Sequence, residues 1–139
     1  MRHRKRSSKL GRPTAYRQAL LANLVCSLIE EKQIQTTLAR AKAARPLAER
    51  MVTLAKEGAL ASRRKALAKL HQKLTIKRLF TEIAPQCKDR SGGYTRIVKL
   101  GYRSSDNSPM AILEWVGIRP VDKKKHLPKE KTQKETKSK

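Results

Sequence analysis

The sequence predicts an α+β fold in which about four helices pack on a small three-stranded sheet. Through residues 14–83, apolar side chains recur at the spacing of amphipathic helices. Residues 94–116 change to two strand-like segments, and a shorter alternating segment occupies residues 33–36. Such elements form a stable domain when the helices cover one face of the sheet. The length of 139 residues suits one domain.

Residues 1–13 are expected to form a flexible basic arm. They have no helical or strand periodicity, and Gly11 and Pro13 discourage a helix. At full extension twelve residues reach ~40 Å, so the arm can enter crevices that the folded body cannot. The arm contains no acidic residue, and its basic residues are Arg2, Arg4, Lys5, Arg6, Lys9 and Arg12.

The first helix is predicted over residues 15–31, with Thr14 as its N-cap. Leu24 is at the centre of an apolar row, so we expect it to be buried against the second helix or the sheet. The end of the helix nearest the arm is polar and is expected to face a nucleic acid. The two apolar rows are Leu20, Leu24, Leu28 and Leu21, Val25, Ile29, and the polar residues are Tyr16, Arg17, Gln18 and Asn23.

A single strand is predicted over residues 33–36, and a second helix over residues 38–57. Thr37 is expected to cap this helix, and Gly58 to follow its last turn in the left-handed conformation. Pro46 lies inside the helical pattern. Because proline removes a backbone hydrogen bond and clashes with the preceding turn, we expect a kink or a break near Arg45.

Two further helices are predicted over residues 61–70 and 75–83, the second with Ile76, Leu79, Phe80 and Ile83 inward and ended by Pro85. Residues 94–100 and 110–116 are then expected to form a hairpin around a polar loop. The globular α+β domain is thus expected over residues 14–116. Residues 117–139 are rich in lysine and have few large apolar side chains, so we expect a disordered basic tail.

The charge of the chain indicates a polyanionic partner. Thirty-four Lys and Arg face eleven Asp and Glu, which gives a formal net charge of +23. Such an excess destabilises a compact chain unless a polyanion neutralises it, and nucleic acid is the usual one. An anionic membrane is the other candidate. No apolar run approaches the roughly 20 residues of a spanning helix, and no signal-peptide segment follows the basic start, so we expect an intracellular protein without a membrane partner.

The sequence offers no pattern for catalysis, metal binding or a cofactor. Cys26 and Cys87 are far apart and have no zinc-ligand spacing around them. Gly92 and Gly93 lack the strand-then-helix context of a phosphate loop and are interpreted as a turn. The histidines and carboxylates are scattered. We therefore expect neither an enzyme nor a small-molecule substrate.

Several segments, in order, resemble the family of bacterial large-subunit ribosomal protein seventeen. The resemblance covers residues 1–116, and the ordered set is far more specific than any one segment. The segments are Met1-Arg2-His3-Arg4-Lys5, Lys9-Leu10-Gly11-Arg12, Ala19-Leu20-Leu21, Thr36-Thr37-Leu38-Ala39, Arg45-Pro46, Thr53-Leu54-Ala55-Lys56, Arg63-Arg64, Gly92-Gly93-Tyr94-Thr95-Arg96-Ile97 and Pro109-Met110-Ala111.

This resemblance implies an α+β protein of the cytoplasmic ribosome that binds folded 23S rRNA near the outer mouth of the peptide exit tunnel. Neighbouring large-subunit proteins are implied partners. The few aromatic side chains argue against a stacking platform for single strands and favour backbone and groove contacts. The candidate RNA-binding residues are Arg2, His3, Arg4, Lys5, Arg6, Lys9, Arg12, Tyr16, Arg17, Asn23, Arg40, Lys42, Arg45, Arg63, Arg64, Tyr94, Arg96 and Arg103.

The sequence departs from the family pattern at two positions. Ser105 precedes Asp106 where the family often has glycine, so a positive φ there would strain the turn. Tyr16 stands where the family commonly has histidine. Two other classes of protein stay open: a nucleoid DNA-binding protein would share the charge but usually has a recognition helix or a dimer seam, and an RNA-modifying enzyme would need a catalytic constellation.

Overall fold

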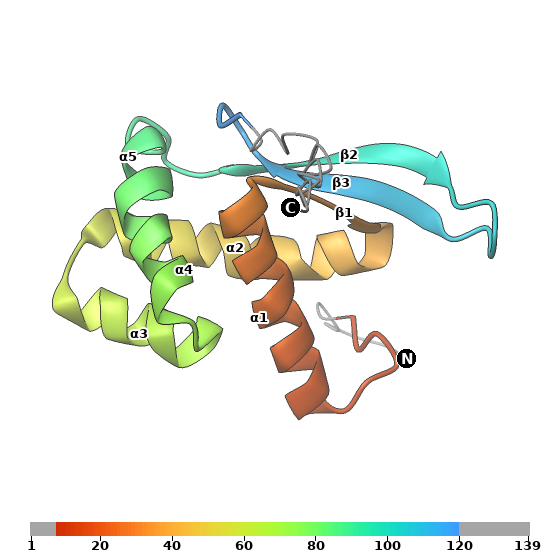
Figure 1. Ribbon diagram of the computed structural model, residues 1–139, viewed down its shortest axis with the longest axis horizontal. Coiled ribbons are helices and arrows are strands. Elements are labelled where there is room, and N and C mark those ends of the chain that lie inside the picture. The colour runs from red at the N-terminus through yellow and green to blue at the C-terminus, as the bar shows by residue number, and fades with distance from the viewer. Residues whose placement is uncertain (1–7, 120–139) are drawn as a thin grey trace, which may run out of the picture.

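The computed structural model describes residues 8–119 and confirms the α+β fold (Figure 1). The predicted arm residues 1–7 and tail residues 120–139 lie outside the described residues. The elements follow the expected order, with the helices first and the hairpin last. They are α1 (Thr14–Glu31), β1 (Gln33–Thr37), α2 (Leu38–Glu57), α3 (Leu60–Leu70), α4 (Lys73–Arg78), the π-helical turn η1 (Leu79–Ile83), α5 (Ala84–Gln86), β2 (Thr95–Tyr102) and β3 (Pro109–Trp115).

The three strands form one antiparallel sheet in the order β1-β3-β2. The hairpin is therefore confirmed, and β1 adds to the free side of β3. Ile34 is opposite Leu113 in one pair, and Ile97 is opposite Leu113 in the other. A bulge between Lys99 and Gly101 shifts the register near the hairpin loop.

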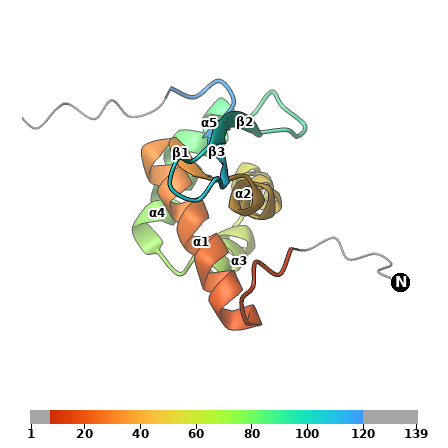
Figure 2. The same ribbon diagram turned by 90° about the vertical axis from the view of Figure 1, so that its right-hand side faces the viewer.

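The helices cover one face of the sheet, and α2 runs beneath the strands (Figures 1 and 2). The alternation along β3 explains this arrangement. Ala111, Leu113 and Trp115 are buried on the helical side, whereas Met110 and Ile112 point the other way and are half-buried. One core therefore lies between the sheet and the helices.

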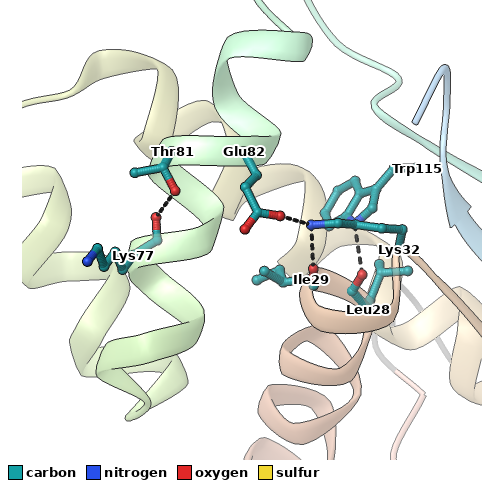
Figure 3. Close-up of polar contacts among 7 residues, drawn as sticks. All are labelled: Leu28, Ile29, Lys32, Lys77, Thr81, Glu82 and Trp115. Atoms are coloured by element: carbon teal, nitrogen blue, oxygen red, sulfur yellow. Dashed lines mark hydrogen bonds and ion pairs between the residues drawn. The ribbon is translucent and has the colours of Figure 1, made fainter. Parts of the chain in front are cut away.

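The junction between α1 and β1 depends on Lys32, which takes a left-handed conformation with φ of 67°. The chain reverses there, and the strand begins at the next residue. Trp115 closes the junction from β3, because its indole Nε1 donates a hydrogen bond to the carbonyl of Leu28 over 2.9 Å (Figure 3). This bond satisfies one of the carbonyls that the end of a helix leaves without a partner.

Helix α2 continues through Pro46, so the expected break near Arg45 does not occur. Pro46 is exposed, as is Lys42, whose carbonyl loses its partner; water can therefore hydrate that carbonyl. Ala44 and Ala48 lie on either side of the proline and are completely buried. Their packing outweighs the missing bond. Gly58 follows the helix in the left-handed conformation, as predicted.

The expected side-chain caps are absent. Thr14 is the first residue of α1 rather than its cap, and Pro13 holds the capping position. Thr37 does precede α2, but its side chain makes no capping hydrogen bond. Thr37 is also the last residue of β1, where its backbone is committed to the sheet. The sequence pattern thus predicts where both helices start. It does not identify the hydrogen-bond partners of the free backbone amides in their first turns.

The last helical segment is longer than expected and contains a π turn. It runs through α4, η1 and α5 to Gln86, and the amide of Ala84 bonds to the carbonyl of Leu79. Pro85 lies within the final turn and does not end the helix before it. In a regular helix its ring would meet the carbonyl of Thr81. The wider π turn includes Thr81, which gives a physical reason for the continuation.

Leu24 is at the edge of the core rather than at its centre. It is only half-buried, whereas Val25, Leu28 and Ile29 are completely buried. The helix is rotated so that the second predicted row, together with Leu28, faces the sheet and α2. The expectation that Leu24 is buried against the second helix or the sheet is therefore met only in part.

The carboxylate of Glu49 holds the start of the hairpin against α2. It accepts hydrogen bonds from the backbone amides of Tyr94 at 3.0 Å and Thr95 at 2.8 Å, and from the Thr95 hydroxyl at 2.6 Å. After β3, Ile118 packs against the core two residues beyond Val116. The division into arm, domain and tail stays a prediction.

Candidate RNA interface

A groove of about 790 Å³ lies between the first halves of α1 and α2, next to the arm. Arg17 and Leu21 are one helical turn apart on α1 and line one wall. Lys42 and Pro46 are one turn apart on α2 and line another. Ser8 of the arm and Pro109 at the start of β3 complete the rim, together with Leu38, Ala39 and Ala43.

The groove brings together two predicted RNA-binding residues, Arg17 and Lys42, from helices separated in sequence. No acidic side chain lines it. Within residues 8–119, neither cation has an ion-pair partner. Two unneutralised positive charges beside an apolar floor suit a backbone phosphate with an adjacent sugar or base.

The basic arm enters the body through a tight turn beside this groove. The amide of Arg12 donates to the carbonyl of Lys9 over 3.1 Å, and Leu10 and Gly11 both have positive φ. The Arg12 guanidinium also bonds to the carbonyl of Leu10 at 3.3 Å. Lys9 and Arg12 are exposed, so the turn presents both charges near the start of α1.

The remaining predicted residues of α1 and α2 are also accessible. Tyr16 is 73% exposed, Asn23 is exposed, Lys42 and Arg45 are exposed, and Arg40 is half-buried. Arg63 and Arg64 are exposed on α3, apart from the arm (Figure 1). The predicted arm ligands Arg2, His3, Arg4, Lys5 and Arg6 lie outside the described residues.

The two predicted arginines of the hairpin are paired with carboxylates. Arg96 lies 2.6 Å from Glu114. Arg103 donates two hydrogen bonds to Asp106, at 2.8 and 2.6 Å. The bonds from Arg103, and then from Ser108, hold the pKa of Asp106 well below its usual range. These partners weaken the positive field that each arginine offers to RNA.

The hairpin loop avoids the strain expected at Ser105. The left-handed residue of the loop is Asn107, with φ of 51°, whereas Ser105 does not have a positive φ. Asparagine tolerates this conformation better than most residues. Asp106 further holds the loop by accepting bonds from the amide and hydroxyl of Ser108. The turn therefore works without the family's glycine before Asp106.

Tyr94 does not belong to a surface. Its side chain is 2% exposed and lies in the core, where the amine of Lys56 is 5.3 Å from the ring centre. The Lys56 amine also donates to the Tyr94 hydroxyl over 3.4 Å. A ring in this position cannot contact RNA, so its prediction as an RNA ligand is wrong. The cause is the tether of its backbone to Glu49, which turns the residue inward.

A group of basic residues between α3 and α4 was not predicted from the sequence. Lys73, Lys77 and the predicted Arg63 line one small hollow with Phe80. The helix was expected to start at residue 75, which left Lys73 outside the pattern. The four-residue spacing of Lys73 and Lys77 was the available signal.

Residues 8–119 contain neither a membrane span nor a metal-ligating cluster. None of the helices in this part of the chain is both long and apolar enough to cross a membrane. Nor do three potential metal-ligating side chains gather there.

Comparison with known proteins identifies the family. A family model described as "Ribosomal protein L17" matches residues 20–116. The large ribosomal subunit protein bL17 of Methylacidiphilum infernorum is 54% identical over 126 residues, which is 90% of this chain and 96% of that protein. The bL17 proteins of Akkermansia muciniphila and Bradyrhizobium diazoefficiens are 53% and 48% identical, over 85% and 89% of this chain and 87% and 89% of their own lengths. The chain therefore belongs to the ribosomal protein L17 family.

Proposed function

We propose that this chain binds folded 23S rRNA and stabilises it within the large ribosomal subunit. As a member of its family, the chain is a structural ribosomal protein of the large subunit, and its place is the bacterial cytoplasmic ribosome. The RNA contact is our inference. The observation that carries it is the acid-free groove that joins Arg17 and Lys42 beside the basic arm.

Electrostatics and shape both support RNA at this groove. The net charge of +23 needs a polyanion, and phosphate contacts release condensed counterions from RNA. The groove is too apolar for phosphates alone, since Leu21, Leu38 and Pro46 form much of its wall. A sugar or an exposed base can cover these side chains while Arg17 and Lys42 bind the adjacent phosphates.

The interface that we propose extends from the groove along the arm. It includes Lys9, Arg12 and Tyr16 at the arm turn and Arg40 and Arg45 on α2. We also retain Asn23 and the arm residues 2–6 as proposed ligands. Arg96 and Arg103 are secondary, because Glu114 and Asp106 partly neutralise them.

The position within the subunit is a further part of the proposal. The family resemblance supports a place near the outer mouth of the peptide exit tunnel, with other large-subunit proteins as neighbours. Cross-linking from Tyr16, which is 73% exposed, identifies the RNA segment at this face in assembled subunits. Cross-links to segments remote from the tunnel mouth would contradict the position but leave RNA binding untouched.

The RNA contact is tested by titrating 23S rRNA with the full chain at several salt concentrations. Arg17→Ala and Lys42→Ala should each lower the slope of log affinity against log salt by ~0.7–0.9. Lys88→Ala is the matched control, because Lys88 is exposed and does not line the groove. Denaturant melts verify that the variants are folded. Equal slopes for all variants would refute the groove as an RNA site, and equal affinity for duplex DNA at matched salt would favour the nucleoid alternative.

A further inference from the structure

Besides the groove between α1 and α2, the protein has a small basic hollow between α3 and α4. The two sites share no lining residue. The volume of the hollow is about 170 Å³, less than a quarter of that of the groove. Arg63 contributes from α3, and Lys73 and Lys77 contribute from α4. The other lining residues are Ile76, Phe80 and Thr81. Each charged residue around this hollow is therefore a cation.

The Arg63 side chain is held in place by an aromatic ring. Its guanidinium carbon lies 4.9 Å from the centre of the Phe80 ring, which is a cation–π contact. Phe80 is half-buried against the core, so the ring is a fixed support. Within residues 8–119 the Arg63 guanidinium donates no hydrogen bond, so its N–H groups remain for a ligand.

The three cations share the hollow without a carboxylate. Lys73 and Lys77 are four residues apart, where like charges destabilise a helix. Within residues 8–119, Lys32, Arg96 and Arg103 are the basic residues with ion-pair partners. The arrangement is therefore electrostatically unfavourable in the free protein, and an anion would relieve it.

The nearest acid on the same helical segment points elsewhere. Glu82 lies in η1, and its carboxylate is 2.5 Å from the amine of Lys32. Figure 3 shows Glu82 directed toward Lys32, while the side chain of Lys77 extends away from it. The Thr81 hydroxyl is also engaged, since it donates to the Lys77 carbonyl over 2.9 Å. The charge of Lys77 is thus left for a ligand from outside.

We propose that Arg63, Lys73 and Lys77 bind a backbone phosphate of a second RNA segment, distinct from the one at the arm. The hollow suits a phosphate group, and Arg and Lys around it supply charge-assisted donors. Helices α3 and α4 lie at one end of the molecule, whereas the described start of the arm and the beginning of α2 lie toward the other (Figure 1). The protein therefore bridges two RNA segments. This inference rests on the proposed binding of rRNA.

The first test compares two matched double variants in titrations of 23S rRNA with the full chain. Lys73→Ala with Lys77→Ala should lower the salt slope by up to ~1.4–1.8, because two lysines no longer neutralise phosphates. Lys65→Ala with Lys69→Ala is the control, because these lysines are also exposed and four residues apart but do not line the hollow. A smaller change in the control supports the site. Equal slopes for the two pairs overturn it.

Phe80→Leu tests the support of Arg63 without removing a charge. Its affinity for 23S rRNA at low salt should fall toward that of Arg63→Ala, while Lys65→Ala, an exposed residue of the same helix, serves as the neighbouring control. If Phe80→Leu binds as tightly as the parent while melting normally, the ring has no role in binding. If it fails to fold, Arg63→Ala alone decides whether this charge contributes.

Directed hydroxyl-radical probing distinguishes one RNA segment from two. An iron chelate is attached to Leu74→Cys, which is 79% exposed on α4 and does not line the hollow, or to Tyr16→Cys. The parent chain is the labelling control because Cys26 and Cys87 are buried. The two positions should cut separate segments of 23S rRNA. Coincident cuts, or none from position 74, overturn the inference. Loss of binding in the Arg17 and Lys42 variants would still support the proposed function in that case.

Inorganic phosphate distinguishes an RNA site from a site for a free anion. Amide NMR shifts around residues 63, 73 and 77 are followed with phosphate alone and with rRNA fragments at matched ionic strength. Shifts with RNA fragments at concentrations where phosphate is silent support the inference. Shifts with phosphate and none with RNA overturn it.

Discussion

The amine of Lys32 lies 2.5 Å from the carboxylate of Glu82 and joins the end of α1 to the π-helical turn η1 (Figure 3). The same amine donates to the carbonyl of Ile29 at 3.1 Å. The side chain of Lys32 is 10% exposed, and that of Glu82 is 47% exposed. The nearly buried charge of Lys32 is therefore neutralised by a carboxylate, that of Glu82, which is about half exposed to solvent.

Removing the carboxylate should destabilise the fold. Glu82→Ala leaves the nearly buried Lys32 amine with a carbonyl as its protein partner, which should cost about 1–3 kcal/mol of unfolding free energy. The exposure of Glu82 argues for a value below that of a fully buried pair. Urea melts measure the change. The control is Asp89→Ala, since Asp89 is exposed and has no ion-pair partner within residues 8–119. An equal effect in both variants would contradict the role assigned to the pair.

Leu28 and Leu24 should differ in their contribution to stability. Leu28 is completely buried, so Leu28→Ala should cost ~2–5 kcal/mol through the transfer energy of the removed atoms and a cavity. Leu24 is half-buried, so water already reaches part of its side chain, and Leu24→Ala should cost clearly less. Denaturant melts of both variants decide the order. A larger effect at Leu24 would mean that the helix is rotated from the position described.

Both thiols should be protected in the native protein. Burial raises the pKa of Cys26, with Glu30 adding to the effect, and burial also raises the pKa of Cys87. Since the thiolate is the reactive form, a disulfide reagent at neutral pH should modify both residues only as fast as the chain opens. Rapid reaction in the absence of denaturant would show that the thiols are accessible.

The same shifts predict a pH dependence. A group with a raised native pKa stabilises the fold fully below its unfolded pKa, and this contribution is lost as pH rises through the native value. For both thiols the loss begins near the ordinary value of 9.0. Stability measured across that range should fall more steeply in the parent than in the variant with Cys26→Ala and Cys87→Ala. Parallel curves would assign the loss to other groups.

The arm should contribute to binding and not to folding. Removing residues 2–12 deletes six basic residues and no acid, so the salt slope should fall by ~0.7–0.9 for each phosphate that the arm neutralises in the parent. The deletion ends before α1, so the melting temperature should change little. The measurement is a salt series with 23S rRNA and a thermal melt. An unchanged slope would exclude the arm as an RNA ligand.

The tail should be dispensable for stability if the cut follows Arg119. Ile118 packs against the core and remains in such a variant. Residues 120–139 offer few large apolar side chains, so their removal should leave the melting temperature nearly unchanged. A cut before Ile118 is the informative comparison, because it removes a side chain that packs on the core. A large drop after the first cut would show that the tail packs on the body.

The sequence by itself determined the class of fold, the order of the elements and the family. Helix α2 was predicted with its observed limits, and the three strands were located, because amphipathic spacing and alternation are local properties of the chain. The charge excess indicated a polyanionic partner for the same reason, since net charge needs no coordinates. The sequence identifies Arg17 and Lys42 as two candidate RNA ligands and does not show that they lie close together.

The tertiary structure alone decided which of these residues meet. Only packing places Arg17 and Lys42 in one groove and gathers Arg63, Lys73 and Lys77 in one hollow. Packing also turns Tyr94 inward through Glu49 and rotates α1 so that Leu24 lies at its edge. Pro46 and Pro85 are tolerated because burial of their neighbours and a π turn compensate for the missing hydrogen bonds. These outcomes depend on contacts between residues distant in sequence, which local periodicity does not encode.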